Sequence, residues 1–212
     1  MKKPREFVNG EFYHVYNRGT EKRNIFSDNY DVARFLECMQ VFNTEKPVGS
    51  LYERSFDKLA SKTRGKALVD FVAYCLNPNH FHFIMRQKVT GGISEMMKRL
   101  GAGYASYFNI KYKRTGGLFS GKYKAKHVAD NDYLLHLSAY VNLNNRVHKI
   151  NSPLVRSSWV EYGKGLNGFC KKEIILKQFR TSKDYLDFAL GSLELMLSRK
   201  NADENISTLL ID

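Results

Sequence analysis

The sequence predicts a single α+β domain in which helices cover a mainly antiparallel sheet. Three observations indicate this class. Segments with the composition of strands alternate along the chain with segments of helical periodicity. The turns between neighbouring strands are short, which is typical of antiparallel pairs. The 212 residues contain no internal repeat or low-complexity tract, and this length suits one hydrophobic core.

The N-terminal part predicts a strand followed by a helix. Residues 11–19 are aromatic and β-branched and end in a glycine, as a strand often does. From Asp28, the expected N-cap, apolar residues recur at helical spacing up to residue 42. Residues 44–67 are polar and contain proline and glycine, so they predict a long connection, and a mobile arm over the site is one interpretation.

The remaining elements follow in order. They are strands over 67–76 and 80–87, a helix over 91–112, a glycine-bracketed loop entering a fourth strand, a helix over 130–149 that Asp130 or Asp132 caps, and a closing helix over 181–200. The asparagine–proline–asparagine turn between the first two strands makes them neighbours. Thr181 and Asp184 at the start of the closing helix have the spacing of a capping box.

Charge indicates the kind of partner. The chain has 34 lysines and arginines against 21 aspartates and glutamates, a net charge of +13. Such a surplus favours nucleic acid, although a solvated surface or attraction to anionic lipid would also accommodate it. No long apolar run predicts a membrane span, and the N-terminus lacks a secretory pattern. With three widely spaced cysteines, we expect a cytoplasmic protein without a membrane partner.

Two histidines stand one residue apart in the strand over 80–87. Side chains alternate across a strand, so His80 and His82 project from one face with their Cβ atoms roughly 7 Å apart. Two imidazoles at that spacing can bind one metal ion, or they are partly buried histidines bonded to neighbours. Because two ligands are too few for a metal site, the metal interpretation requires a third from elsewhere.

The helix after Asp132 offers that ligand. Tyr140 and Asn144 are four residues apart and therefore lie on one helical face. Asn144 has a carbonyl oxygen for a hard divalent ion, and the Tyr140 phenol lies beside it. The alternative is a Tyr140 that packs through its ring and an Asn144 on the surface.

Basic residues form the third pattern. The strand around 122–126 places three lysines on one face, where they suit phosphates rather than a core. Upstream, basic and aromatic residues are interleaved, which suits a single-stranded backbone with stacked bases. An edge strand that uses lysines against aggregation is the alternative. The candidate nucleic-acid contacts are Lys111, Lys113, Arg114, Lys122, Lys124 and Lys126, with Arg18 on the first strand.

Four segments, taken in order, resemble one family. They read YHVYNRG, YCLNPNHFHFIMRQ, YASYFNIKYKRTGGLFSGKYKAKHV and NDYLLHLSAYVNLNNRV. Together they look like the single-tyrosine HUH transposases, in the group of the REP-associated tyrosine and IS200-like transposases. HUH denotes a histidine, a bulky hydrophobic residue and a histidine, here His80, Phe81 and His82. The resemblance extends over roughly residues 8–150, and four motifs in matching order make it specific.

The resemblance implies a fold and a division of the chain. The family's fold is a ferredoxin-like sheet with the histidine pair on a central strand. Residues 1–165 would form the transposase (nuclease) domain. Residues 166–212 would form a C-terminal helical extension packed on the same domain.

The resemblance also implies roles for the candidate residues. Tyr140 aligns with the family's nucleophile, and Asn144 with an amide residue near the metal that His80 and His82 bind. The last motif departs from its relatives, because Asn142 replaces a histidine and Asn145 a proline. Tyr140, the nucleophile that the resemblance implies, is present despite these two differences.

The implied activity is cleavage of single-stranded or hairpin DNA with Mg²⁺ or Mn²⁺ as cofactor. Tyr140 would form a covalent 5′-phosphotyrosine, which a 3′-OH then attacks in strand transfer without ATP. The family includes monomers and homodimers. Two other classes of function remain open: a DNA- or RNA-binding regulator that does not cut, and a metal phosphodiesterase that uses water.

Overall fold

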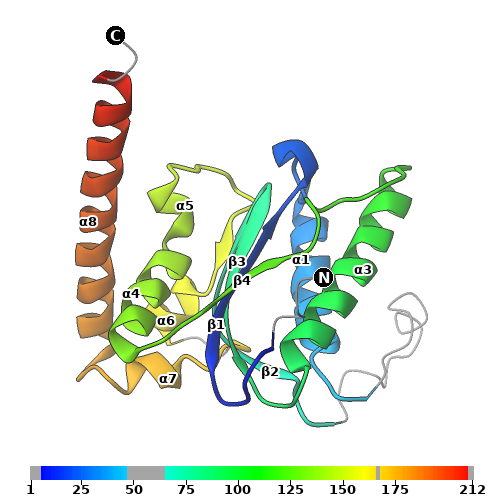
Figure 1. The fold of residues 1–212 in the computed structure, drawn as a ribbon, viewed down its shortest axis with the longest axis horizontal. Helices are drawn as coiled ribbons and strands as arrows, with labels where there is room; N and C mark the ends of the chain where they lie inside the picture. Colours follow the sequence, from blue (N-terminus) through cyan, green and yellow to red (C-terminus); the bar gives the residue numbers. More distant parts are fainter. Residues whose placement is uncertain (1–5, 47–64, 166–167, 210–212) are drawn as a thin grey trace.

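A five-stranded antiparallel sheet forms the centre of the protein, in the order β4-β1-β3-β2-β5 (Figure 1). The computed structural model describes residues 6–46, 65–165 and 168–209. The strands are β1 (Phe12–Arg18), β2 (Val69–Asn77), β3 (His80–Gln87), β4 (Lys124–His127) and β5 (Arg156–Ser157). All four pairings are antiparallel, which confirms the predicted sheet and the α+β class.

Helices cover both faces of the sheet. One face carries α1 (Asn29–Val41) and α3 (Gly92–Lys111) (Figure 1). The other carries α4 (Asn131–Asn142), α5 (Asn144–Val147), α6 (Trp159–Lys164), α7 (Glu173–Leu176) and the long α8 (Ser182–Leu209). A short 3₁₀ helix, η1 (Thr20–Lys22), follows β1. Within the described ranges, every helix is too short or too polar to span a bilayer.

The order of elements explains the position of β3. The chain runs β1-α1-β2-β3-α3-β4 with sheet order β4-β1-β3-β2, which is the ferredoxin-like arrangement that the resemblance implied. The short β5 adds a fifth strand beside β2. The strand that begins with His80 is therefore central, with two strands on either side.

Alternation along the central strands separates two cores. Phe81 and Phe83 join the core with α1 and α3, whereas Ile84 joins the core with α4 and α8. Side chains on one strand project alternately, so His80 and His82 share the face of Ile84. Polar residues at these positions therefore point towards α4, away from the larger aromatic core.

Short polar side chains start the helices as expected. Asp28 accepts from the Asp31 amide while Asp31 accepts from the Asp28 amide, a reciprocal capping box for α1. Asp130, rather than Asp132, caps α4 by accepting from the Tyr133 amide at 2.7 Å. The predicted Asp28 cap and the first of the two alternatives for α4 are thus confirmed.

The C-terminal helix is attached to the end of α4 by a buried polar network. The Tyr185 hydroxyl, on α8, accepts from Asn142 Nδ2 at 2.8 Å and lies 3.1 Å from the Ser138 hydroxyl. The Ser158 hydroxyl donates to Asn142 Oδ1 at 2.6 Å. Asn142, which departs from the family motif, is therefore buried with both ends of its amide satisfied. The division of the chain at residue 165 remains a prediction.

Two expectations about element boundaries differ from the structure. The helix predicted over 130–149 is interrupted at Leu143, whose φ of −110° and ψ of 16° end the regular α turns. The fourth strand begins only at Lys124, because Gly121 turns the chain with a φ of 73°. Lys122 therefore lies in a bend, and only Lys124 and Lys126 share a strand face. Most of the predicted long connection, residues 47–64, lies outside the described residues.

Two glycines of α3 provide a stability test. A Cβ on Gly103 would lie 2.7 Å from two atoms of the Phe42 ring, whereas a Cβ on Gly101 would meet no atom within 4 Å. We expect Gly103→Ala to destabilise the protein by about 1–3 kcal/mol through overpacking. Gly101→Ala should stabilise it by about 0.5–1 kcal/mol because alanine favours the helix. Urea denaturation of both variants measures this, and equal midpoints would contradict the packing at Phe42.

Candidate active site

His80 and His82 face α4 from the centre of the sheet. Their ring centroids are 5.3 Å apart and the rings are perpendicular. His82 is buried and His80 half-buried. The two histidines therefore share one face, as the alternation predicts.

Asparagines hold the His80 ring on both sides. Asn79 Oδ1 lies 2.6 Å from Nδ1 of His80, and Asn77 Nδ2 lies 2.9 Å from its Nε2. Burial lowers the pKa of His80, so the ring is neutral at pH 7. Nδ1 then donates its proton to the Asn79 carbonyl, and Nε2 accepts from Asn77. The lone pair of Nε2 is therefore engaged by the Asn77 amide.

Asn144, the first residue of α5, brings an amide oxygen to the same point. Its Oδ1 accepts from Asn77 Nδ2 at 2.8 Å and lies 3.2 Å from Nε2 of His80. Two electron-pair acceptors thus face each other with no proton between them. Ligand atoms bound to one Mg²⁺ at about 2.1 Å lie roughly 3 Å apart in an octahedral shell. Nε2 and Oδ1 therefore have the spacing of two ligands of one divalent cation.

The other end of the Asn144 amide faces the nucleophile candidate. Asn144 is fully buried, and among the described residues its Nδ2 is the one buried side-chain atom without a well-aligned hydrogen-bond partner. The same amide lies close enough to Tyr140 to lower the pKa of the phenol. Asn144 thus presents an acceptor towards His80 and a donor towards Tyr140.

His14 on β1, which sequence reasoning missed, contacts His82 directly. Nε2 of His14 lies 2.9 Å from Nδ1 of His82, and the two rings are stacked 5.1 Å apart. The register places His14 opposite Ile84, so its side chain shares the histidine face of the sheet. The sequence shows His14 only as a polar residue at an alternating position of the first strand. Its place beside His82 depends on the pairing of β1 with β3.

Both buried histidines are neutral at physiological pH. Burial, assisted by the charge of Lys126, lowers the pKa of His14 to about 4. Burial, followed by the neighbouring histidines, lowers the pKa of His82 to about 2. The contact between the rings therefore contains one N–H proton. When Nδ1 of His82 donates it, Nε2 of His82 carries a lone pair for a metal ion.

Tyr140, on α4, lies beside the histidines of its own chain. Its ring centroid is 5.7 Å from that of His82 and 6.0 Å from that of His14, with the rings close to perpendicular. Burial raises the pKa of the half-buried Tyr140, and the Asn144 amide partly opposes the rise. The phenol is therefore protonated at neutral pH in the metal-free protein.

The donor atoms fit a weakly held divalent cation. In the described part of the chain, no three His, Cys, Asp or Glu side chains are grouped as a metal site. The set formed by His80, His82 and Asn144 is therefore neutral, with two imidazoles and one amide oxygen. These ligands suit Mn²⁺ well and Mg²⁺ less well. Because they carry no negative charge, a phosphate in the site would strengthen binding of the cation.

Three of the predicted basic contacts lie on or beside the histidine face. In the β1–β4 register, Lys124 pairs with Tyr16 and Lys126 with His14. Lys126 also lies over the Tyr133 ring of α4, with Nζ 5.0 Å from its centroid. Arg18, exposed at the end of β1, pairs with His80. These cations border the site and can meet a phosphate backbone there.

The predicted contacts at the end of α3 are placed differently. Lys111 Nζ lies 2.7 Å from a carboxylate oxygen of Asp28 and 2.7 Å from one of Asp31, so this ammonium joins α3 to the start of α1. Arg114 lies over the Phe108 ring, and Lys113 follows in the turn after α3. This group lies on the face of α1 and α3, remote from the histidines, and Lys111 has a structural role there.

Comparisons with known proteins identify the family. A search of curated proteins found no match. A structure of a REP-associated tyrosine transposase bound to a REP hairpin is 12% identical, with a TM-score of 0.47, over 80% of this chain and 90% of that one. A Deinococcus radiodurans protein described as a candidate transposase is 17% identical, with a TM-score of 0.36, over 72% and 99%. The model of the IS200-like transposases matches residues 7–144, from the residues before β1 to Asn144, and the chain belongs to this family.

Proposed function

We propose that this protein is a metal-dependent, single-tyrosine nickase and strand transferase acting on single-stranded or hairpin DNA. The observation that carries the proposal is the position of Tyr140 beside His82 and His14, with Asn144 between the phenol and His80. A protein that only binds DNA has no need of a half-buried phenol beside a pair of candidate metal ligands. The family membership of the chain supports the same class of reaction.

His80, His82 and Asn144 would hold the cation. When bound, the cation polarises a non-bridging oxygen of the scissile phosphate and neutralises charge there. Asn77 and Asn79 orient His80, and His14 orients His82, so the ligands are arranged before the metal arrives. Lys124 and Lys126 hold the DNA backbone on the same face.

Tyr140 performs the covalent step. Its oxygen attacks phosphorus, so a bond forms between the phenol oxygen and phosphorus while the bond from phosphorus to the 3′ oxygen breaks. The phenol proton leaves to solvent, and the departing 3′ oxygen takes up a proton. The product is a 5′-phosphotyrosine and a free 3′-OH. Attack on the phosphotyrosine by a 3′-OH reverses the step and joins strands, with no ATP.

The experiment is formation of a covalent adduct. Full-length protein is incubated with a labelled DNA hairpin bearing single-stranded flanks, with Mn²⁺, with Mg²⁺ or with EDTA, and separated on a denaturing gel. We expect a protein–DNA band with either metal and none in EDTA. Failure to form it with any metal and any flank sequence would contradict the transferase and leave the DNA- or RNA-binding regulator. Cleavage without a band would instead indicate the water-using phosphodiesterase.

His14→Ala is expected to weaken Mn²⁺ binding by about 10-fold to 100-fold, because His82 loses the partner that sets its tautomer. Isothermal titration of Mn²⁺ in the presence of an uncleavable hairpin measures the loss. His136→Ala is the matched control, since His136 lies on α4 but bonds to Ser192 on α8. Equal affinities for His14→Ala and wild type would show that this histidine only fills space.

The metal-free protein is expected to lose stability in mild acid. His14 titrates near 6.5 when unfolded and near 4 when folded, so below pH 6.5 the unfolded chain binds more protons and stability falls as the pH is lowered towards 4. At pH 5 this histidine alone costs on the order of 2 kcal/mol relative to pH 8. Urea denaturation in EDTA at pH 8 and pH 5 measures it. The His14→Gln variant should be less sensitive to acid, and an unchanged difference would argue against a buried neutral His14.

A further inference from the structure

The amide of Asn77, the last residue of β2, covers two of the candidate metal ligands at once. Its Nδ2 lies 2.9 Å from Nε2 of His80 and 2.8 Å from Oδ1 of Asn144. These two ligand atoms are 3.2 Å apart. Asn77 is fully buried, so its hydrogen bonds are not shared with bulk water. One NH₂ group therefore donates to both atoms that would otherwise face a cation.

The carbonyl end of Asn77 has a partner of its own. Cys75 lies two residues earlier on β2, on the same face of the strand, and its Sγ is 3.8 Å from Asn77 Oδ1. Burial raises the pKa of Cys75 to about 12, so the thiol keeps its proton at neutral pH and is a weak donor to this oxygen. The thiol thus orients the Asn77 amide with its NH₂ group towards His80 and Asn144.

His80 has a single lone pair for the site, and Asn77 uses it. In the neutral ring, Nδ1 carries the proton that Asn79 Oδ1 accepts, so Nε2 has one lone pair. An amide N–H and a cation cannot share that lone pair. The Asn144 oxygen has two lone pairs and can serve both partners. Metal binding at Nε2 therefore requires Asn77 to release at least its bond with His80.

Release of Asn77 opposes metal binding. The displaced Nδ2 stays buried and loses a hydrogen-bond acceptor, which costs free energy that the cation has to offset. The candidate ligands are neutral, so their attraction for a cation is weak, whereas a phosphate in the site would add negative charge. The bonds of Asn77 and the neutrality of the ligands therefore both favour a metal-free site until a phosphate is present.

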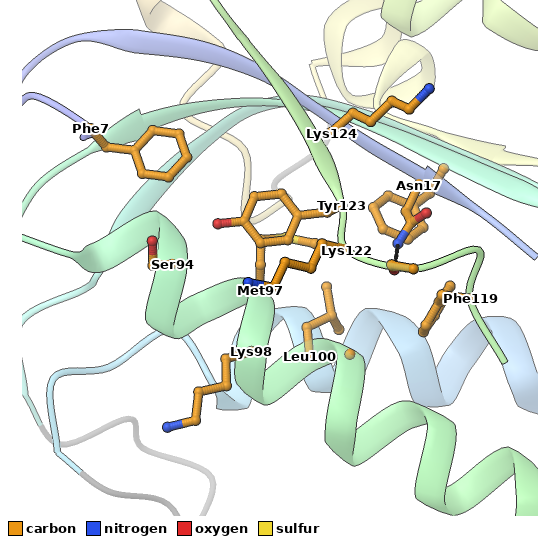
Figure 2. Close-up of a pocket in the computed structure, with 13 residues that line it drawn as sticks. Phe7, Asn17, Ser94, Met97, Lys98, Leu100, Phe119, Lys122, Tyr123 and Lys124 are labelled. Atoms are coloured by element: carbon orange, nitrogen blue, oxygen red, sulfur yellow. Dashed lines mark hydrogen bonds between the residues drawn. The ribbon is translucent and has the colours of Figure 1, made fainter. Parts of the chain in front are cut away.

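The pocket on the other face of the sheet is separate from this arrangement. It has a volume of about 790 Å³ and lies between α3 and the segment that enters β4, with Tyr123 above Met97 (Figure 2). Phe81 lines this aromatic pocket together with Phe7 and Phe119, but none of the three candidate ligands does. Because a molecule in that pocket would not reach Asn77, its release has to come from the histidine face.

We propose that Asn77 competes with the cation for His80 and so keeps the metal site closed until the DNA phosphate arrives. The proposal rests on the proposed function for the cation and for the phosphate. The phosphate supplies the negative charge that the ligands lack, and Asn77 Nδ2 then releases His80. Asn77 is thus a positioning residue that holds the ligands in place and makes metal binding depend on the substrate.

Asn77→Asp and its matched control Asn79→Asp test this competition. The first change replaces the donor with an oxygen that faces His80 and Asn144, so the competing bonds are lost and a charged ligand is gained. The second adds the same charge at Nδ1 of the same ring, where an oxygen already accepts. Without DNA, we expect Asn77→Asp to bind Mn²⁺ at least about 100-fold more tightly than wild type, and Asn79→Asp within about fivefold.

Asn77→Ala is the second variant, because it removes the donor without burying a charge. It should bind Mn²⁺ about 10-fold more tightly than wild type in the absence of DNA, since no buried amide then loses its partner. This variant tests the same claim if Asn77→Asp does not fold. An Asn77 that only orients His80 would give the opposite sign, with weaker Mn²⁺ binding in both variants.

Titration calorimetry with Mn²⁺ measures the affinities, first without DNA and then with an uncleavable hairpin. The hairpin should tighten Mn²⁺ binding to wild type by about 10-fold or more, and Asn77→Asp should lose most of this difference. Urea denaturation gives a readout that is independent of DNA. In EDTA, Asn77→Asp should unfold at a lower urea concentration than Asn79→Asp, because acceptors then face each other, and Mn²⁺ should reverse that order.

The outcomes separate this proposal from the proposed function. If neither Asn77 variant binds Mn²⁺ more tightly than wild type, the competition is overturned even when wild type forms the covalent adduct. If Asn79→Asp tightens Mn²⁺ binding as much as Asn77→Asp does, the gain comes from charge alone and the competition is again overturned. If both Asn77 variants bind more tightly but wild type forms no adduct with any metal, the competition stands and the transferase does not.

Discussion

Tyr140→Phe is expected to abolish the covalent adduct, lowering its rate of formation by about 10⁴-fold or more, because a phenyl ring has no oxygen with which to attack phosphorus. The ring should keep its edge contacts with His82 and His14, so Mn²⁺ binding and hairpin binding should stay within about twofold of wild type. Denaturing gels measure the adduct, and titration calorimetry measures the two affinities.

A second phenol near the site makes this test stringent. Tyr16, on β1, stacks on His82 with ring centroids 5.4 Å apart, and it is the neighbouring tyrosine that the geometry offers as a rival. Tyr16→Phe should retain the adduct, since Tyr140 has the Asn144 amide beside its hydroxyl. An adduct that survives Tyr140→Phe but not Tyr16→Phe would transfer the role to the first strand.

His80→Ala is expected to remove metal-dependent cleavage while leaving hairpin binding largely intact. The variant loses Nε2 and leaves the Asn144 oxygen with Asn77 as its remaining partner, so affinity for Mn²⁺ should fall by more than about 100-fold. We expect DNA affinity to come mainly from phosphate contacts with lysines such as Lys124 and Lys126, which this change does not touch.

His148, which lies close to His80, provides the control for His80→Ala. His148 lies 5.9 Å away, centroid to centroid, but is exposed, so His148→Ala should keep metal binding within a fewfold of wild type. Because the ligands are neutral, Mn²⁺ should bind wild type more tightly when the hairpin is present than when it is absent. A His80→Ala protein that loses hairpin binding instead would show that the histidine is structural.

The local rules predicted the elements that depend on neighbouring residues. The Asp28 cap, the apolar stripe of α3 and the turn between β2 and β3 all follow from side chains within a few residues of each other. The break in the helix at Leu143 could not be predicted from neighbouring residues. It depends on how α5 packs on β2 and α8 rather than on the helical period. Likewise, alternation predicted that Lys122 shares a strand face with Lys124 and Lys126. The positive φ of Gly121 places a bend there, so the strand begins only after Lys122.

The candidate site was predictable in part for the same reason. His80 and His82 share a face because a strand alternates, and the family motif points to Tyr140 and Asn144. His14 required the pairing of β1 with β3, which brings together residues 68 positions apart. The roles assigned to these residues in metal binding and catalysis remain predictions that the experiments above test.

By itself, the sequence determined the α+β class, the ferredoxin-like order of elements implied by its motifs, and the family. Those depend on short-range periodicity, capping and motif spacing, which any stretch of chain carries with it. Only the tertiary structure decided that Tyr140 reaches the histidines of its own chain, that Lys111 is bound to carboxylates, and that an aromatic pocket lies behind the histidine strand. These depend on register, on helix packing and on which charges meet, and such long-range contacts exist only after the chain has folded.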